Sequence, residues 1–496
     1  MLTLAEYAAR DAVGLAELIK QGEVTAAEVH TIAVSAIAAV NKVLNAVSEG
    51  PWERPLEYRR DSVFAGVPFV LKDILCHPSG VPMHFGCRAL SDGIVYDHDS
   101  YLMSRFRNAG LALVATTRTP ELALNANTEP LLGGSTRNPW DPSKSPGGSS
   151  GGTAALVAAG AVPLGHANDG GGSIRIPAAR TGLVGLKPSR GRVPLGPDQQ
   201  DVMFGNGIEF AVTRSVRDCA TLLDSVSGNA PGEKFSAPPP ERPYREEVAT
   251  SRGPLRIAVC TDGWSGREVD PQVLSVVEDT ANLLRELGHT VDYARPEFSW
   301  EELLEAFTTT WCAGTASTVA ALTEALGSGP NRQQFEATTI TCADAGLRIT
   351  PVQLGRAFDT VNTVSRTVAA FMAEWDLLLT PTAITTSQDL GALDSDNTTD
   401  SAEEWVRKVL SDFPFCAMYN QTGAPAINVP IGQSDGGLPI GIQLGADVYQ
   451  ESLLLGVAAQ LEIARPWHDR LPAVHVASVT NRKLCNIINA IGGFPG

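Results

Sequence analysis

The amino-acid sequence predicts an α/β protein with a mainly parallel sheet that is covered by helices on both of its faces. Short apolar segments bounded by Gly or Pro have the composition of buried strands. Six such segments occur, at residues 66–74, 112–117, 255–260, 377–382, 425–432 and 439–446. Helical patterns lie between them, and strands that alternate with helices favour a parallel, two-sided sheet.

The helices are predicted from their start and stop signals. The first 45 residues or so contain two helical patterns, and Thr25 with Glu28 forms a capping box before the second. Asp270 and Pro271 open a further helix that stops near Gly288. A long pattern beginning with "TPVQLG" at residue 350 opens in the same way, and the Pro-rich, charged segment at about 228–254 predicts a connecting loop.

Composition excludes several classes of function. The chain has 496 residues and a net charge of −17, which disfavours binding to nucleic acid and to anionic membranes. No segment has the length and apolarity of a membrane span, and the acidic, amphipathic N-terminus does not resemble a signal peptide, so we expect a cytoplasmic protein. Eight cysteines without CxxC or zinc-ligand spacing predict buried free thiols and no metal site.

Two glycine-flanked serines are the first candidates for chemistry. They lie in "SPGGSSGGTAALVAAG" at 145–160 and in "NDGGGSIRIPAA" at 168–179. Each patch by itself is also compatible with a simple turn. The G-x-S-x-G match at 147–151 is weak as a nucleophile elbow, because the Pro-containing segment before it cannot be a central strand. The P-loop and the dinucleotide fingerprint are both missing.

Lys72 lies within the apolar segment "GVPFVLKDI". Its side chain could reach water from the end of a strand. Burial would instead favour the neutral amine, which can act as a base. A serine hydroxyl needs such a partner to become a good nucleophile, and no His lies in a motif that connects it to either serine.

Taken together, these stretches resemble the amidase signature family of serine hydrolases. The resemblance rests on Lys72, on Ser149 and on Ser173, which follows Ser149 by 24 residues, each in its motif. "TPEL" at 119–122, "GLVGLKPSRGRVP" at 182–194 and "TGAPAINVPIG" at 422–432 extend it to roughly residues 60–470. It implies a large, central, twisted mixed sheet that is mainly parallel, with helices on both faces.

The resemblance also implies roles for individual residues. Ser173 is similar to the nucleophile, Ser149 to a bridging serine held by a cis peptide bond, and Lys72 to the base. The implied oxyanion hole consists of the N–H groups of Gly170, Gly171, Gly172 and Ser173. Supporting positions are Asp169, Arg175, Thr153 and Ser150, although Asp169 and Thr153 could be cap or turn residues and Arg175 a surface ion pair.

The implied activity is hydrolysis of a carboxamide C–N bond in a linear, aryl or cyclic amide, or in a carbamate, through an acyl-enzyme and without metal or cofactor. The alternatives are an A-type subunit of a glutamine-dependent amidotransferase, an esterase of the same family, an inactive binding protein and an unrelated α/β-hydrolase. The substrate is expected to be a small-molecule amide, and a homodimer is the assembly to test, because dimers are common among such relatives.

The glycine motif suggests a branch of the family. Many members have T-D-T-G-G-S where this chain has "NDGGGS", which resembles the branch containing 6-aminohexanoate-cyclic-dimer hydrolases. "NTEP" at 127–130, "EFAVTRSV" at 209–216 and "WCAG" at 311–314 suggest the same branch. Asn125 and Cys312 are the candidates for the substrate pocket, with a small core thiol as the other interpretation of Cys312.

Three regions are expected along the chain. Residues 1–60 form an N-terminal helical segment packed on the core. Residues 61–475 form the amidase signature domain, with peripheral insertions at about 228–254 and 300–375. Residues 476–496 form a C-terminal tail without a recognisable pattern.

Overall fold

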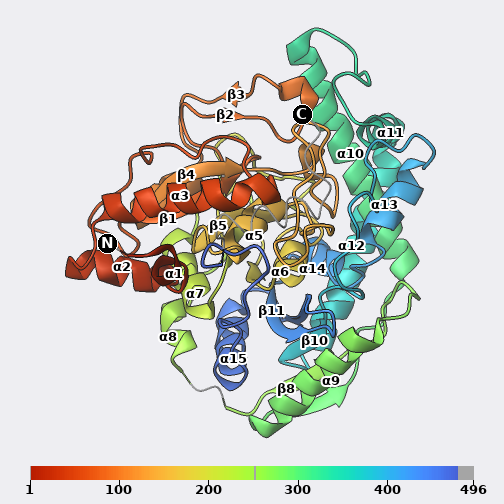
Figure 1. The fold of residues 1–496 in the computed structure, drawn as a ribbon. Coiled ribbons are helices and arrows are strands. Elements are labelled where there is room, and N and C mark those ends of the chain that lie inside the picture. Colours follow the sequence, from red (N-terminus) through yellow and green to blue (C-terminus); the bar gives the residue numbers. More distant parts are fainter. Residues whose placement is uncertain (1, 251–252, 479–496) are drawn as a thin grey trace.

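The computed structural model describes residues 2–250 and 253–478, arranged around one large sheet (Figure 1). Within this part of the chain, ten strands pair in the order β4-β1-β5-β7-β6-β11-β12-β10-β8-β9, and β2 and β3 form a separate hairpin. The strands are β1 Val67–Lys72, β2 Pro82–Met83, β3 Ile94–Val95, β4 Leu111–Thr117, β5 Leu164–Asp169, β6 Val184–Lys187, β7 Ile208–Thr213, β8 Arg256–Val259, β9 Thr290–Tyr293, β10 Leu377–Pro381, β11 Ala426–Gln433 and β12 Pro439–Gly445.

Helices cover both faces of this sheet, and α10–α13 gather at one side of the molecule (Figure 1). The α-helices are α1 Leu4–Ala8, α2 Ala12–Gln21, α3 Ala26–Leu44, α4 Tyr101–Ala109, α5 Gly151–Ala158, α6 Arg175–Thr181, α7 Val216–Val226, α8 Tyr244–Val248, α9 Pro271–Glu286, α10 Trp300–Leu326, α11 Ala337–Leu347, α12 Pro351–Met372, α13 Ala402–Leu410, α14 Ala417–Thr422 and α15 Glu451–Ala464. Two short 3₁₀ helices are η1 Arg88–Leu90 and η2 Glu121–Ala123.

The mixed sheet is confirmed, and its parallel pairs lie at its two ends. β4, β1 and β5 run parallel to one another, and so do β10, β8 and β9. The strands between them pair in an antiparallel manner, from β5 through β7, β6, β11 and β12 to β10. Parallel pairing therefore accounts for the ends of the sheet, including the end that carries Lys72, and not for its middle.

All six predicted strands are present, and the strands that the pattern missed are β5, β6, β7 and β9 of the large sheet and β2 and β3 of the hairpin. β5 was missed because its sequence, "LGHAND", carries Gly, His, Asn and Asp in place of the usual β-branched residues. These polar side chains are nevertheless buried, and β5 lies in the sheet between β1 and β7. A strand with low strand propensity thus leads into the glycine motif.

The N-terminal segment forms three helices where two were expected. Asp11 is the N-cap residue of α2, and its side chain accepts a hydrogen bond from the backbone N–H of Gly14. This cap separates α2 from α1. By length and composition, α3 is apolar enough to cross a membrane, but it packs against β1, β4 and α5 and buries nine of its residues. The segment that was expected to be a connecting loop also contains a helix, α8, which packs against α7 and α15. Of the predicted tail, residues 479–496 lie outside the described residues.

Candidate active site

Lys72 is the last residue of β1 and is fully buried at the centre of the site. Its Nζ lies 2.7 Å from Ser149 Oγ and 2.5 Å from Asn168 Oδ1. Asn168 comes from β5, which runs parallel to β1, so the ends of both strands present their side chains at the same edge. Because an amide oxygen can only accept, Asn168 takes one N–H of the lysine and fixes the direction of Nζ.

Burial changes the protonation of this lysine. It lowers the pKa of Lys72 from 10.5 to about 7, although the negative charges of Glu209 and Asp169 act in the opposite direction. Glu209 is itself paired with buried His166. A substantial share of Lys72 is therefore neutral near pH 7 and able to accept a proton.

Ser149 lies in the tight turn that precedes α5. The peptide bond between Gly148 and Ser149 is cis, and Ser149 has no exposed surface. A Cβ atom on Gly148 would meet the carbonyl oxygen of Asn127 at 2.6 Å, so no larger residue fits in this turn. The turn fixes the Ser149 hydroxyl above the end of β1, beside the Lys72 amine.

The glycine motif follows β5 directly, and not all of its backbone N–H groups are free to donate a hydrogen bond to a substrate. The N–H of Gly172 donates to Asp169 Oδ1 at 2.7 Å, which removes Gly172 from the expected oxyanion hole. Gly172 has a φ of +136°, so this turn requires glycine. Among the described residues, no acceptor is found for the N–H groups of Gly170, Gly171 and Ser173, and all three residues line the cavity described below.

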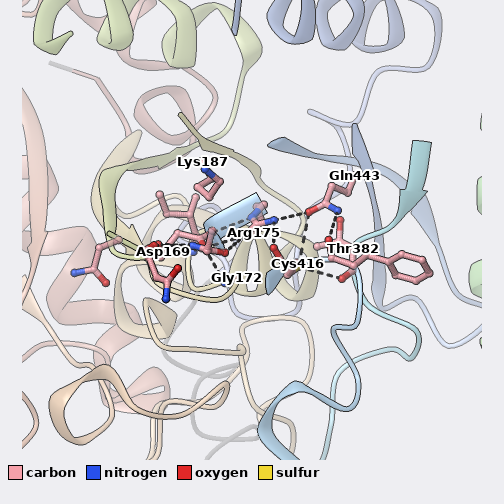
Figure 2. A network of polar contacts seen from close by, with 12 residues as sticks. Asp169, Gly172, Arg175, Lys187, Thr382, Cys416 and Gln443 are labelled. Atoms are coloured by element: carbon pink, nitrogen blue, oxygen red, sulfur yellow. Dashed lines mark hydrogen bonds and ion pairs between the residues drawn. The ribbon is translucent and has the colours of Figure 1, made fainter. Parts of the chain in front are cut away.

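Asp169 and Arg175 hold the glycine motif in place through a buried network (Figure 2). Both side chains have no exposed surface, and Arg175 donates to Asp169 from Nε and Nη2 at 2.9 Å each. Burial by itself would raise the pKa of the Asp169 carboxyl, but Arg175, together with Lys187 and Asn420, outweighs it and lowers the pKa to about 2. Asp169 and Arg175 therefore form a buried ion pair and not a surface ion pair.

The remaining donors of Arg175 reach the C-terminal part of the chain. Its guanidinium donates to the carbonyl oxygen of Cys416 at 3.0 Å, to Gln443 Oε1 at 2.8 Å and to Asn420 Oδ1 at 2.7 Å. Asn420 in turn donates to the carbonyl oxygen of Asp169 at 2.7 Å. The loop that carries Ser173 is therefore fixed by groups from α14 and β12.

The two other supporting residues contact the backbone around the site. Ser150 Oγ donates to the carbonyl oxygen of Asn168 at 3.3 Å. Thr153 Oγ1 donates to the carbonyl oxygen of His166 at 2.9 Å and lies 2.6 Å from Thr117 Oγ1. Thr153 thus links α5 to β5 and β4, and its hydroxyl points to these strands and not to Lys72 or Ser149.

A cavity of about 310 Å³ opens onto Ser149 and Ser173, at the lower end of the size range of small-molecule sites. Asn125 lines it, with its side-chain amide fixed by the carbonyl oxygen of Leu393 and by Ser395 Oγ. Cys312 is buried in α10 and does not line the cavity, whereas its neighbour Trp311 does. The apolar part of the wall includes Leu122, Leu124, Val202, Met203, Phe204 and Leu410.

Sequence reasoning missed Asn168, Asn420 and Gln443. Asn168 directly precedes Asp169 in a motif already recognised, and its place on a strand beside β1 is the signal that could have identified it. Asn420 lies two residues before the matching "TGAPAINVPIG" stretch. Gln443 is a buried polar residue in an otherwise apolar strand, which normally requires a partner.

Comparison with known proteins places this fold and site in a family. The amidase family model matches residues 23–455. The 6-aminohexanoate-cyclic-dimer hydrolase of Paenarthrobacter ureafaciens is 37% identical over 481 residues, 93% of this chain and 96% of the relative. An acylamidase of Rhodococcus erythropolis is 33% identical, over 82% of this chain and 83% of the relative.

A solved structure of a 6-aminohexanoate cyclic dimer hydrolase is 35% identical and superposes with a TM-score of 0.88. The superposition covers 96% of this chain and 100% of that chain. The chain belongs to the amidase signature family. It is a hydrolase that acts on amide bonds, and its similarity to cyclic-dimer hydrolases extends over nearly its whole length.

Proposed function

We propose that this protein hydrolyses small, largely apolar amides with Ser173 as nucleophile, Ser149 as bridging serine and Lys72 as base. The observation that carries the proposal is the 2.7 Å contact between buried Lys72 Nζ and Ser149 Oγ, at the floor of a cavity that Ser173 also lines. The relatives named for 6-aminohexanoate cyclic dimer support a cyclic amide as the first substrate to test.

The proposed first step moves two protons. With one N–H directed to Asn168, neutral Lys72 offers its lone pair to the hydroxyl of Ser149. Ser149 gives its proton to Lys72 and takes the proton of Ser173, whose oxygen attacks the carbonyl carbon of the amide. The relay then returns a proton to the leaving amine, and water releases the acyl group from Ser173 by the same route.

The negative charge of the tetrahedral intermediate needs hydrogen-bond donors. The N–H groups of Gly170, Gly171 and Ser173 are the proposed donors, because Gly172 is committed to Asp169. Removing one such donor typically costs about 2.7–4 kcal/mol of transition-state stabilisation. Asp169 and Arg175 act indirectly, by holding these amides in one arrangement before the substrate binds.

The lining of the cavity determines the proposed substrate class. Its walls are mainly apolar, and Asn125, Asn168, Gln199 and a few hydroxyl groups are its neutral polar contacts. The two carboxylates that also line it are already paired, Asp169 with Arg175 and Asp201 with Lys234. Such a lining favours an uncharged amide whose acyl and amine parts are hydrocarbon chains or rings. Carbamates and esters with the same shape are the further substrates to compare.

The test is hydrolysis of a panel of cyclic amides, anilides, primary amides, carbamates and esters. Ser173→Ala, Ser149→Ala and Lys72→Ala are each expected to lower kcat by about 10²-fold or more. Ser35→Ala, on the exposed face of α3, is the control with wild-type activity. A serine-directed inhibitor should form a covalent adduct that mass spectrometry places on Ser173. An adduct on Ser149, or full activity of Ser173→Ala, would refute the assignment of roles.

A further inference from the structure

A second cluster of chemically active side chains lies outside the catalytic centre. His77, His98 and Asp198 bring their ligand atoms within 4.8 Å of one another. His77 Nε2 lies 2.9 Å from Asp198 Oδ2, and His98 Nε2 lies 3.0 Å from the same oxygen. No sequence spacing reveals this cluster, because its members come from three separate loops.

We propose that His77, His98 and Asp198 bind a divalent transition-metal ion, with Zn²⁺ as the best fit. Two imidazole nitrogens and one carboxylate are typical zinc ligands, whereas Ca²⁺ and Mg²⁺ prefer oxygen ligands only. Zinc–nitrogen bonds of about 2.0–2.1 Å place neighbouring tetrahedral ligands roughly 3.3 Å apart. The two nitrogen–oxygen separations, 2.9 and 3.0 Å, are a few tenths of an ångström shorter than this value, and the two imidazole nitrogens lie within 4.8 Å of each other, so a modest adjustment of the three side chains would admit the ion.

The hydrogen bonding of His98 supports this interpretation. Its Nδ1 lies 2.7 Å from Asp97 Oδ1, and its Nε2 faces Asp198. A neutral imidazole has only one N–H, so it cannot donate to carboxylates on both sides. A protonated ring donates to both carboxylates, and a metal ion at Nε2 would take the place of the second proton while Nδ1–H donates to Asp97, as metal-bound histidines commonly do to a carboxylate.

The three loops are held together by their backbones before any ion binds. The N–H of Ser100 donates to the carbonyl oxygen of His77 at 3.0 Å, and the N–H of Tyr101 donates to that of Gly196 at 2.8 Å. The ring of His77 is also stacked on Tyr96, with centroids 3.6 Å apart. The ligands are therefore partly preorganised. The side chain of His98 is 43% exposed, which gives an ion and a completing water molecule access from solvent.

The cluster lies next to two segments that form the wall of the catalytic cavity. Asp198 is followed by Gln199 and the segment 201–204, which form one wall of the catalytic cavity. His77 follows Leu75, another residue of the cavity wall, and lies on the loop that leaves β1. A bound ion would fasten the 198–204 segment to that loop and so fix the shape of the substrate site.

The other cluster of potential ligands, formed by Cys76, His166 and Glu209, is a poorer site. All three side chains are buried, and His166 is already paired with Glu209. The Cys76 thiol has its pKa raised by burial, which opposes formation of the thiolate that a metal needs. Cobalt bound there would nevertheless be recognisable by its sulfur-to-metal absorption.

The test is Co²⁺ binding to the full-length chain without an affinity tag, after removal of metals with EDTA. Wild type is expected to bind one equivalent with a visible ligand-field spectrum, to release it to Zn²⁺, and to show a higher Tm with Zn²⁺. His98→Ala and Asp198→Asn should lose this binding while keeping the wild-type circular dichroism spectrum. Asp97→Asn should weaken it by about 10–100-fold.

His468→Ala is the matched control, because His468 is an exposed histidine beside a single carboxylate, Asp469. It should bind Co²⁺ as wild type does. Absence of saturable binding in wild type would overturn the proposal, and so would unchanged binding in His98→Ala and Asp198→Asn. A sulfur-to-metal band that persists in His98→Ala would assign the ion to Cys76 instead. Because the readout is binding, it does not depend on the proposed hydrolysis mechanism.

Discussion

At the scale of single residues, the proposed mechanism uses a lysine whose pKa is lowered by burial to about 7. Lys72 was identified from the sequence as a lysine in an apolar strand, but the reason for its orientation was not visible there. That reason is Asn168, 96 positions further along the chain, whose oxygen accepts from Nζ. A contact between distant positions leaves no periodic or local signal, which is why sequence reasoning found the proposed base and missed its hydrogen-bond partner.

Activity should depend on the protonation of Lys72. Because burial lowers the pKa of this lysine to about 7, the fraction of neutral base rises as the pH rises through that value. For an uncharged amide, kcat/KM is expected to increase about tenfold per pH unit below about pH 7 and to level off above it. A pH–rate profile measures this, and a constant kcat/KM between about pH 5 and pH 9 would argue against a lysine base.

Replacement of Asn168 should change kcat more than KM. Asn168→Ala removes the acceptor that directs Nζ, and we expect kcat to fall by about 10–100-fold, a part of what a general base contributes. Asn168→Asp keeps an acceptor but adds a negative charge, which should move the pH–rate profile to higher pH. If Asn168→Ala kept both the kcat and the pH profile of wild type, Asn168 would have no positioning role.

At the scale of elements, the serine loop is fixed by a helix and a strand that follow much later in the chain. The glycine motif predicted a tight, anion-binding turn, and three of its four expected amides are available. Gly172 is not, because Asp169 lies close enough to take its N–H. Spacing alone could not reveal this competition for one donor, since it depends on the rotation of each peptide plane in a folded turn.

Arg175→Met should destabilise the protein strongly. It leaves the buried Asp169 carboxylate without its main partner, a change that typically costs about 3–5 kcal/mol. A lower Tm and a loss of kcat are expected together, because the oxyanion loop depends on the same pair. The matched control is Arg59→Met, which breaks an exposed Arg–Asp pair and should leave Tm almost unchanged. Equal shifts of Tm for the two variants would contradict this account.

A pair of buried carboxyl groups should make stability depend on pH. Glu336, which caps α11, donates its backbone N–H to Glu121 Oε1 at 2.8 Å. Burial, followed by the proximity of Glu121, raises the pKa of Glu336 to about 8, and burial raises that of Glu121 to about 7. The folded protein therefore holds protons that the unfolded chain releases near pH 4.5, so stability is lost as the pH rises from there to about 8.

Thermal unfolding across this pH range measures the effect. The Tm of wild type should decrease as the pH rises from about 4.5 to about 8. Glu336→Gln should make this decrease of Tm with pH less steep, because it removes one of the two carboxyl groups that become charged. Glu403→Gln, at an exposed position on α13, is the control and should keep the wild-type slope. If Tm fell more steeply with pH in Glu336→Gln than in wild type, the predicted direction of the pH dependence would be wrong.

At the scale of the whole molecule, much of the fold could be predicted, but the pairing of the strands in the middle of the sheet could not. Six strands, the capped helices and the large helix-covered sheet follow from local patterns. The antiparallel middle of the sheet does not, because β5, β6 and β7 were not recognised as strands. β5 is polar and β6 has only four residues, whereas β7, with the sequence "IEFAVT", was missed although it is largely apolar. The homodimer and the cytoplasmic location stay predictions, which size-exclusion chromatography with light scattering and cell fractionation would test.

The anchoring of Arg175 has a consequence for the chain as it is synthesised. Lys72, Ser149 and Ser173 leave the ribosome well before Cys416, Asn420 and Gln443, which supply the acceptors around the guanidinium. A nascent chain that ends near residue 410 carries every proposed catalytic side chain but not the groups that fix the serine loop. Residues 1–410 expressed alone should therefore show no hydrolysis, and we expect the proposed nucleophile to become reactive only after α14 and β12 have been synthesised.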